Sequence, residues 1–249
     1  HARGWAQPPR HVTYGVTADE AHRFGLPCGG TLELVLEFDP DADGLLQLTD
    51  QLLSGALVRR SLDLATGQAT LGRTDAPQAL EIDAQTLHSV LGPGYRMLLI
   101  GAGTLTEYLA TMAIFNGFVV TICDPRQEYM ASLQIQGVQR SSLMPDDAVT
   151  AFRPDLRSCV IALSHDPKLD DMALLEAMQS PAFYVGAIGS RRNAQSRRER
   201  MQQHFDVSAD TLARLHSPAG LSIGSKTPAE IAVSIMAQVI ACKNGNLNA

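Results

Sequence analysis

The chain has 249 residues, 45% of them hydrophobic and 18% charged, which is typical of a folded globular protein and excludes an intrinsically disordered one. Its formal net charge of -6 argues against a general nucleic-acid binder and against a protein that coats membrane surfaces. No uninterrupted apolar run reaches about 18 residues, so we predict no transmembrane helix and no membrane partner.

The chain begins with His1 instead of an initiator methionine, and no basic segment followed by an apolar segment marks a signal peptide. We interpret it as a fragment or a processed chain whose true beginning is missing. Any localisation signal would lie in that missing part.

The four cysteines are Cys28, Cys123, Cys159 and Cys242, and no two are spaced as CxxC. The last three lie in or beside apolar segments, so we expect them to be reduced, buried side chains that pack as small hydrophobic groups. Reduced cysteines favour a reducing compartment, and we therefore predict a cytoplasmic protein.

Residues 1–92 predict a small α+β domain. Thr17 and Glu20 form a capping-box pattern at the start of a helix over 17–24, and a second helix is expected over 45–54. Alternation over 31–38 predicts a half-buried antiparallel strand, and Val58–Leu64 with Gln68–Arg73 predicts a hairpin. The apolar face of the 31–38 strand would carry Leu32, Leu34, Leu36 and Phe38.

The pattern changes after Gly92-Pro93-Gly94, where short apolar runs begin to alternate with helical segments. This alternation predicts a parallel sheet with helices on both faces, a Rossmann-type α/β domain over residues 95–245. The apolar runs are Met97–Ile100, Phe118–Cys123, Cys159–Leu163 and Phe183–Ile188. The expected helices are Leu105–Asn116, Asp170–Gln179, Arg191–Phe205 and one from Thr227-Pro228 to about Cys242.

The loop after the first run reads Gly101-Ala102-Gly103-Thr104-Leu105-Thr106 and contains the first two glycines of a dinucleotide fingerprint. Such glycines allow a phosphate to approach unpaired amides at a helix start. Asp124, which ends the second run, is placed to bond a ribose-like diol. Thr106 at the third glycine position is a departure, and a Rossmann fold with an empty, vestigial site is the alternative.

The loop after the third run reads Ser164-His165-Asp166 and continues to Asp170 and Asp171. A divalent-metal site is conceivable, but we favour Asp170 as a helix cap with Asp171 in the first turn. His165 is a candidate for ligand contact or proton handling, and a loop-ordering hydrogen bond is its alternative.

The loop from Gly186 through Gly189 to Ser190 leads into a helix that opens with Arg191-Arg192. Arginines there oppose the helix dipole unless an anion is bound, which favours an anion site over a solvated basic face. We expect Arg197, Arg198 and Arg200 at the surface or facing a partner.

The small-residue loop 216–225 is expected to pass close to a ligand or to another backbone segment. The chain has no GxSxG, HExxH or P-loop pattern, so we see no hydrolase or kinase signature.

Several segments resemble the XdhC/CoxI family, maturation factors of molybdenum hydroxylases such as xanthine dehydrogenase and aldehyde oxidoreductase. They include GLPCGGTLELVLE, LLIGAGTLTEYLA, VTICDPR, ALSHDPKLDD, YVGAIGSRRN and LHSPAGLSIGSKTPAEIAVSIMAQVIA, in the family's order from about Tyr14 onward. The resemblance implies a chaperone that binds the molybdenum cofactor, protects it, supports its sulfuration and inserts it into an apo molybdenum hydroxylase. It also implies a homodimer, with a cysteine desulfurase and a cofactor nucleotidyltransferase as further partners.

Two departures accompany the resemblance: Thr104 stands where the family usually has histidine, and an upstream glycine-and-cysteine motif is absent. Cys28, in a Pro-Cys-Gly-Gly turn, is the cysteine expected to contact the cofactor or to serve sulfur chemistry. The predicted cofactor-binding residues are Cys28, Gly101, Ala102, Gly103, Thr104, Asp124, Arg126, Ser164, His165, Asp166, Gly186, Gly189, Ser190 and Arg191. We predict no catalytic residue and no metal ligand.

The expected cargo is molybdopterin or its cytosine dinucleotide form. An NAD(P)-dependent oxidoreductase is the main alternative, because the GxG loop with Asp124 would also suit a nicotinamide dinucleotide. An adenosylmethionine-dependent methyltransferase is a third possibility, which the Arg191-Arg192 loop argues against. The apolar C-terminal helix also suggests a homodimer, with burial against its own sheet as the alternative.

Overall fold

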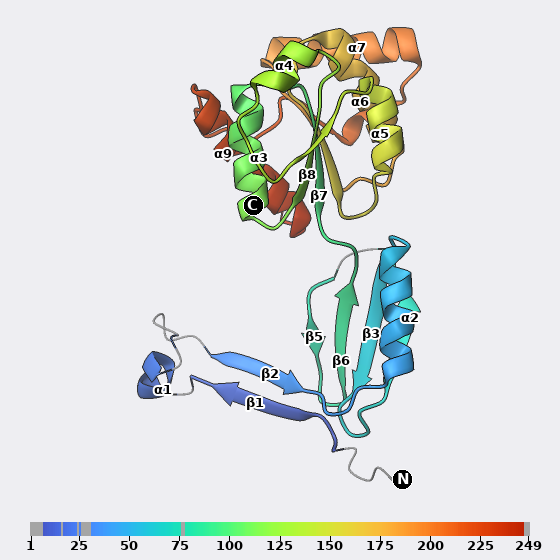
Figure 1. Cartoon of the computed structure of the whole chain (residues 1–249), viewed down its shortest axis with the longest axis vertical. Coiled ribbons are helices and arrows are strands. Elements are labelled where there is room, and N and C mark those ends of the chain that lie inside the picture. Colours follow the sequence, from blue (N-terminus) through green and yellow to red (C-terminus); the bar gives the residue numbers. More distant parts are fainter. Residues whose placement is uncertain (1–6, 16, 24, 26–30, 76–77, 247–249) are drawn as a thin grey trace. The chain divides into compact units, whose positions relative to one another are not determined.

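The computed structural model describes residues 7–15, 17–23, 25, 31–75 and 78–246. The chain divides into two compact units, His1–Pro93 and Gly94–Ala249, coloured blue to blue-green and green to red in Figure 1. The boundary falls within Gly92-Pro93-Gly94, where the sequence pattern changes. In the part of the chain that is described, no helix is long and apolar enough to cross a membrane.

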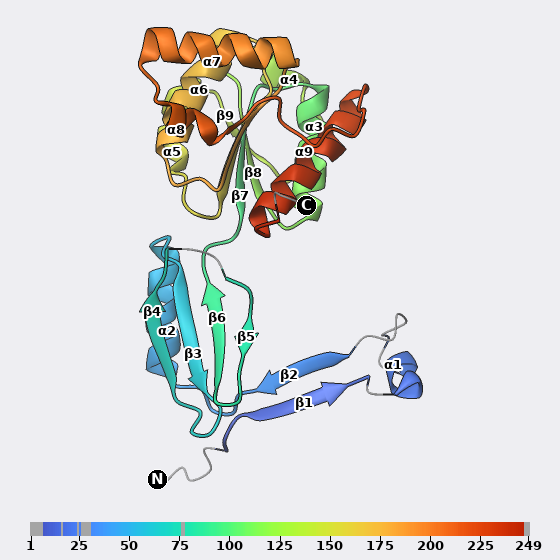
Figure 2. The ribbon, with the colours of Figure 1, turned by 180° about the vertical axis from the view of Figure 1, so that it is seen from behind.

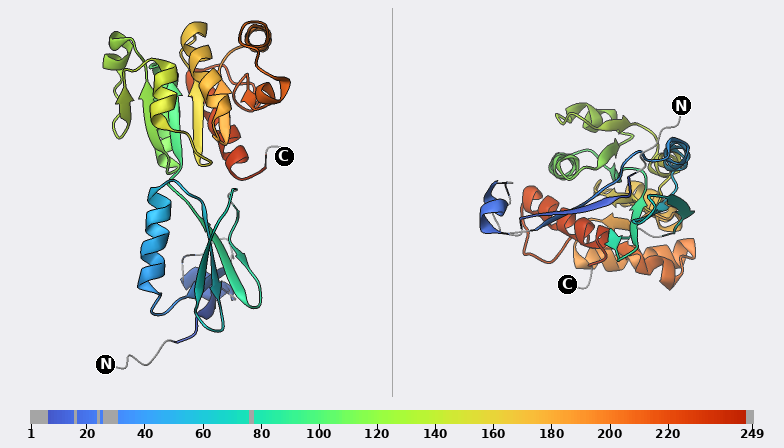
Figure 3. Two further views of the ribbon diagram at one scale, coloured as in Figure 1. Left: turned by 90° about the vertical axis from the view of Figure 1, so that its right-hand side faces the viewer. Right: turned by 90° about the horizontal axis from the view of Figure 1, so that it is seen from below.

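The first unit combines a two-stranded ribbon with a four-stranded antiparallel sheet. The ribbon pairs β1 (Arg10–Tyr14) with β2 (Leu32–Leu36), and α1 (Ala18–Arg23) lies between them in sequence. The sheet has the order β4-β3-β6-β5. Its strands are β3 (Val58–Asp63), β4 (Ala69–Arg73), β5 (Glu81–Ile82) and β6 (Thr86–Leu91), and α2 (Ala42–Leu53) packs along it (Figure 3).

The predicted hairpin and the second helix of this unit are confirmed. The β3–β4 turn is held by Asp63, whose Oδ1 accepts hydrogen bonds from the amides of Ala65 and Thr66. The 31–38 strand is antiparallel as expected, but the prediction that one of its faces is buried is wrong. Leu32, Leu34 and Leu36 remain 39–41% exposed, because this strand belongs to a ribbon of only two strands and not to the larger sheet.

The second unit is built on a six-stranded, fully parallel sheet with the order β12-β11-β10-β7-β8-β9. The central strands are continuous apolar runs, as a sheet covered on both faces requires. The strands are β7 (Arg96–Ile100), β8 (Val119–Cys123), β9 (Gln139–Ser141), β10 (Ser158–Ala162), β11 (Tyr184–Ala187) and β12 (Leu215–His216).

Helices cover both faces of this sheet, and alternate side chains of each strand enter two separate cores. Helices α3 and α9 lie on one face, and α5 and α6 on the other (Figure 2). Met97 and Leu99 belong to the core with α3 and α9, whereas Leu98 and Ile100 belong to the core with α5 and α6. The helices are α3 (Thr104–Phe115), α4 (Gln127–Ser132), α5 (Pro145–Phe152), α6 (Pro167–Gln179), α7 (Arg191–Phe205), α8 (Ala209–Ala213) and α9 (Pro228–Lys243).

The Rossmann-type fold predicted from the sequence is confirmed, together with its four apolar strands and main helices. Helix α9 begins at Pro228 behind a Thr227–Glu230 capping box. Much of its apolar surface is covered within its own unit, because Ile235, Met236 and Val239 are buried in the core shared with α3. Val233 is 47% exposed, and the homodimer stays a prediction.

The strand order reverses between β7 and β10. From β7 the chain builds β8 and β9 on one side, and then crosses to build β10, β11 and β12 on the other. Ligands of open α/β sheets bind at the carboxyl ends of the strands beside such a switch point. In this chain, the loops after β7 and β10 lie beside that point, and the loop after β11 is next to them.

Candidate functional site

The glycine turn after β7 brings two loops into contact. Gly101 has φ +101°, and a Cβ at this position would lie 2.5 Å from the Cα of Ser164 in the loop after β10. Its lack of a side chain therefore serves the protein's own packing. Thr106, the departure from the glycine fingerprint, is buried and donates from Oγ1 to the carbonyl of Gly101 at 2.6 Å, so threonine fits here.

Gly103 lies in a different environment. Its φ of 176° is extended backbone that any residue can adopt, and a Cβ would meet no atom within 4 Å. Gly103 is the N-cap of α3, and no side chain caps that helix start. Neither backbone conformation nor internal packing demands glycine here, and the open space allows a ligand to approach.

Asp124, at the end of β8, is fully buried and already engaged by four donors. Its Oδ2 accepts from the amide of Ala102 and from Arg126 Nη2, both at 2.8 Å. Its Oδ1 accepts from the amide and the Nε of Arg126, at 3.0 and 2.9 Å. Asp124 therefore joins the glycine turn to Arg126, and the ribose role predicted for it stays a prediction.

Electrostatics favour the ionised form of this carboxylate. Burial by itself would raise the pKa of Asp124, but the hydrogen bonds from Arg126 and from the Ala102 amide outweigh it, and the pKa lies below its ordinary value. The Arg126 guanidinium also stacks on the ring of Tyr129, 3.9 Å from its centroid. The carboxylate of Asp124 therefore has its hydrogen-bond partners within the chain.

The loop after β10 differs from the prediction at its helix start. Helix α6 begins at Pro167, three residues earlier than expected, and its cap is Asp166, which accepts from the Lys168 amide at 2.9 Å. The prediction that Asp170 caps the helix is therefore wrong. Asp170 is buried and accepts from the amide and the hydroxyl of Ser164, at 3.1 and 2.6 Å.

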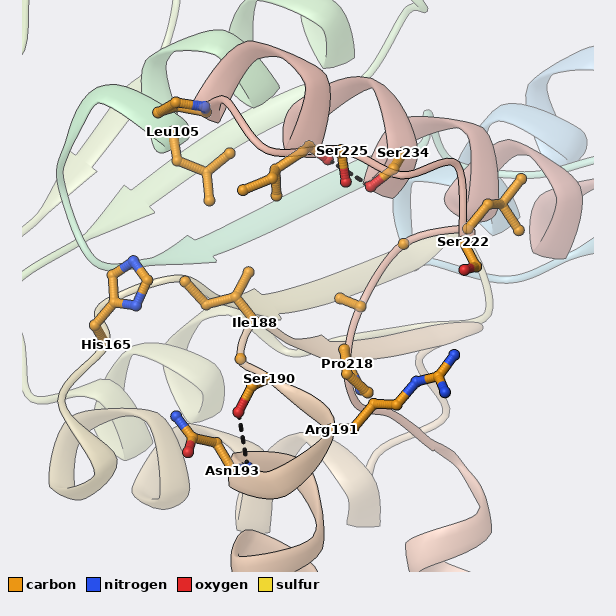
Figure 4. Close-up of a pocket in the computed structure, with 16 residues that line it drawn as sticks. Leu105, His165, Ile188, Ser190, Arg191, Asn193, Pro218, Ser222, Ser225 and Ser234 are labelled. Carbon is orange, nitrogen blue, oxygen red and sulfur yellow. Dashed lines mark hydrogen bonds between the residues drawn. The ribbon is translucent and has the colours of Figure 1, made fainter.

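His165 projects from this loop with a left-handed backbone, φ +60°. Its side chain lies at the edge of a cavity (Figure 4). Within the described residues, no group of three or more histidine, cysteine, aspartate or glutamate side chains is arranged to hold a metal ion.

The predicted glycine loop after β11 is shorter than expected. Gly186 lies inside β11 and is buried, and a Cβ there would lie 2.6 Å from the ring of Tyr184. Gly186 therefore makes room for a tyrosine of its own strand and is not a loop residue. Gly189 and Ser190 do form the loop, and Ser190 caps α7 by accepting from the Asn193 amide at 3.1 Å.

The basic run of α7 separates into two kinds of arginine. Arg191 and Arg192 lie at the helix start, as expected, and both are exposed. The prediction that the later arginines lie at the surface or face a partner is wrong for Arg197, which is buried. Arg198 is half-buried and donates to the carbonyls of Leu212 and Leu215. Arg200 is half-buried against Asp171.

A cavity of about 600 Å³ opens above the ends of β10 and β11 and reaches α9 (Figure 4). None of the described residues that line it is acidic, although the whole chain carries a net charge of -6. The lining residues are Leu105, His165, Ile188, Gly189, Ser190, Arg191, Asn193, Pro218, Ala219, Gly220, Leu221, Ser222, Ser225, Pro228, Ile231 and Ser234.

The cavity brings together only part of the predicted site. His165, Gly189, Ser190 and Arg191 line it. The other described members of the predicted set do not, namely Gly101, Ala102, Gly103, Thr104, Asp124, Arg126, Ser164, Asp166 and Gly186. Cys28 lies outside the described residues.

The largest omission from the predicted site is the segment Pro218–Ser225, which forms one wall of the cavity. The sequence signals for it are its richness in small residues and its place in the LHSPAGLSIGSKTPAEIAVSIMAQVIA segment of the family resemblance. Gly220 has φ +103°, and a Cβ there would lie 2.4 Å from Ser234 Oγ, so the loop lies directly on α9. The Gly220 amide donates to Gln238 Oε1 at 2.7 Å, and the Tyr184 hydroxyl donates to the same oxygen.

The described cysteines are free, and none lines the cavity. Cys123 and Cys159 are buried as predicted, whereas Cys242 is half-buried. Burial raises the pKa of Cys123 and of Cys242 to about 11, and it raises that of Cys159 as well. All three favour the unreactive thiol near neutral pH.

The fold and this cavity define a Rossmann-type protein with a cavity at the carboxyl edge of its sheet. The model of the XdhC Rossmann domain matches residues 97–239, more than half of the chain, and the chain belongs to that family.

Known proteins similar to this chain support the assignment. A protein of Bacillus subtilis named as a probable xanthine dehydrogenase subunit is 28% identical over 59% of this chain and 43% of its own length. The molybdenum cofactor insertion chaperone PaoD of Escherichia coli is 22% identical over 86% of this chain and 60% of its own length. The chain spans between 41% and 60% of the length of the curated relatives that it matches.

A solved structure has the same fold. The crystal structure of a protein described as a xanthine dehydrogenase from Bacillus halodurans superimposes with a TM-score of 0.69 at 23% identity. The match covers 96% of this chain and 76% of the other.

Proposed function

We propose that this chain binds the molybdenum cofactor as cargo and inserts it into an apo molybdenum hydroxylase of the xanthine dehydrogenase or aldehyde oxidoreductase type. The name of PaoD, a molybdenum cofactor insertion chaperone, and that of the Bacillus subtilis relative support this proposal. The cargo would lie in the cavity above β10 and β11.

The observation that carries the proposal is the charge of the cavity wall. Among the described lining residues, Arg191 is the only arginine or lysine, Ser190 caps the 15-residue helix α7 beside it, and none is acidic. A helix N-terminus favours an anion, and a guanidinium can pair with phosphate through two hydrogen bonds. The pterin cargo ends in a phosphate or in a pyrophosphate-linked nucleotide, which matches such a wall.

The remaining walls suit the organic part of such a cargo. Leu105, Ile188 and Ile231 provide apolar surface. Ser222 and Ser225, from the 218–225 loop, add hydroxyl groups that can donate or accept hydrogen bonds. A volume of about 600 Å³ lies within the range of small-molecule sites, about 300 to 1,000 Å³. A cytosine dinucleotide form would need space beyond this volume.

Sulfuration of the cargo would need a sulfur donor outside these walls. The pKa values of Cys123, Cys159 and Cys242 are all raised by burial, and none of these thiols lines the cavity. We propose that the described residues hold the cargo while a separate cysteine desulfurase, or Cys28, handles the sulfur. A nicotinamide dinucleotide suits the chain less well, because the oxygens of Asp124 already accept from Ala102 and Arg126.

The test is to purify the full chain from cells that make the cofactor and to identify the retained ligand by mass spectrometry. We expect a molybdopterin or its cytosine dinucleotide. The loaded protein should then restore activity to an apo molybdenum hydroxylase. A nicotinamide nucleotide or adenosylmethionine as the retained ligand, or loaded protein that fails to restore activity, would contradict the proposal.

A further inference from the structure

A buried ion-pair network is bonded to the loops that line the cavity. Arg197, in the middle of α7, keeps only 7% of its side chain exposed and faces two buried carboxylates. Its Nη2 donates to Asp170 Oδ2 at 3.2 Å, and its Nε donates to Asp171 Oδ1 at 3.1 Å. Arg200, on the next turn, pairs with Asp171 from the outer side. The proposed cargo contacts involve none of these four residues.

The same arginine also reaches two other loops. Its Nη1 donates to the carbonyl of Ile188, which precedes Gly189, at 3.2 Å, and to Ser217 Oγ, which precedes Pro218, at 3.4 Å. Asp170 extends the network to Ser164, next to His165, through the amide and hydroxyl of that serine. One guanidinium is thus bonded, directly or through one carboxylate, to all three strand-end loops that supply the cavity wall.

Stability alone does not account for this arrangement. Ion pairs withdrawn from water contribute little net stability, because desolvation offsets their attraction, and apolar side chains of the same volume would often do as well. Burial raises the pKa of Asp170, which means that the fold opposes its ionisation. A rigid guanidinium fork whose N–H groups donate to acceptors in several directions does, however, fix the relative positions of its partners.

We propose that Arg197 is a positioning residue that holds the loops after β10, β11 and β12 in the single arrangement that binds cargo. The inference rests on the proposed function, because the three loops matter together only if the cavity binds a ligand. Arg197 acts through its partners and does not contact the cargo itself.

The first test needs no cargo. Amide hydrogen exchange of the full chain is compared between wild type, Arg197→Met and Arg197→Lys, with Arg200→Lys as the matched control, since Arg200 pairs with Asp171 and bonds none of the three loops. In Arg197→Met we expect at least about tenfold faster exchange in segments 163–166, 188–190 and 216–221, with β7 and β8 unchanged. Arg197→Lys should give a smaller change in the same segments. If Arg197→Met does not fold, the comparison of Arg197→Lys with wild type is the test.

The second test measures retention of molybdopterin by the same variants. We expect Arg197→Lys to retain at least about tenfold less than wild type, and Arg200→Lys to retain nearly as much as wild type. Faster exchange throughout the sheet, or no change in the three loops, would overturn the positioning role. Loosened loops with full retention would overturn it too, while leaving the proposed function intact. If wild type retains no cofactor, the proposed function fails, and the exchange experiment alone decides whether Arg197 orders the loops.

Discussion

Two corners of the same sheet edge use arginine and aspartate in opposite ways. After β8, Arg126 turns back onto Asp124, and together they fill the place where a dinucleotide-binding domain usually keeps a free carboxylate. After β11, Arg191 is exposed in a cavity whose described lining contains no carboxylate. The first corner is closed by the chain's own charges, and the second leaves a positive charge without a partner among the lining residues.

The difference shows that a glycine-rich turn followed by an acidic strand end does not by itself define a nicotinamide site. The carboxylate must also be available, and the neighbouring arginine decides whether it is. Substitutions at the two corners test this difference, and the largest effects are expected where the backbone itself is constrained.

Replacement of Gly101 should have the largest effect on stability, because this glycine joins the two sides of the switch point. In Gly101→Ala the new Cβ would lie 2.5 Å from Ser164 Cα on a backbone with φ +101°. We expect a loss of about 2–4 kcal/mol in the free energy of unfolding, measured by chemical denaturation.

Gly103→Ala is the matched control, since its backbone is extended and its Cβ would meet no protein atom. We expect it to lower stability by no more than about 1 kcal/mol, because alanine is a poorer N-cap than glycine. Equal losses in the two variants would show that the turn is constrained as a whole, and that Gly103 leaves no space for a ligand.

Loss of the Asp124 charge should have the next largest effect on the free energy of unfolding, and this effect should depend on pH. In Asp124→Asn the Arg126 guanidinium loses its partner, and we expect a loss of about 2–3 kcal/mol near pH 7. The pKa of Asp124 is lowered below 3.8 in the folded chain, so its charge contributes stability above about pH 4. That contribution disappears as the pH falls through the folded-state pKa.

The difference between wild type and Asp124→Asn, followed by denaturation at several pH values, should therefore narrow below about pH 4. A difference that stays constant across the acid range would show that the hydrogen-bond geometry, and not the charge, holds this corner closed. Strong binding of NADH by the wild-type protein at any of these pH values would contradict the claim that the Asp124–Arg126 pair closes this corner.

A smaller effect is expected from the cap of α7. Ser190→Ala removes the acceptor for the Asn193 amide and should cost about 1 kcal/mol, measured by thermal unfolding. Ser208→Ala removes the equivalent cap of α8 outside the cavity and is the matched control. Both variants should lose similar stability, but only Ser190→Ala should also lose cargo retention. Equal retention in the two variants would place the cargo away from the start of α7.

Much of the fold could be predicted because its central strands are continuous apolar runs, such as Met97–Ile100, and its helices carry strong caps. Helix α7 has the predicted bounds, and α9 begins at the predicted Thr227-Pro228. The segment between Asp124 and Ser158 was missed. Strand β9 is a three-residue polar edge strand, and α4 and α5 are short, so none of them carries a readable periodicity.

The site was harder to predict than the fold. The spacing of arginines along α7 does not reveal that Arg197 points inward, because its carboxylate partners are 26 and 27 residues away in sequence. Gly186 and Gly189 look alike in the sequence, yet only the second lies in a loop, because the strand continues to Ala187. Asp124 stands at the acidic position of the dinucleotide fingerprint. Its carboxylate oxygens, however, accept hydrogen bonds from Arg126, two residues later, where a ribose would otherwise bind.

The central claim is that the cargo binds at the open corner, against Arg191, and the most direct measurement is retention of molybdopterin by Arg191→Lys beside Arg192→Lys. Arg192 is also exposed in the same helical turn but does not line the cavity. We expect Arg191→Lys to retain at least about tenfold less cofactor, because lysine cannot reproduce the bidentate fork, with an unchanged melting temperature. Arg192→Lys should behave as wild type in both respects. Full retention by Arg191→Lys, or an equal loss in both variants, would contradict the claim.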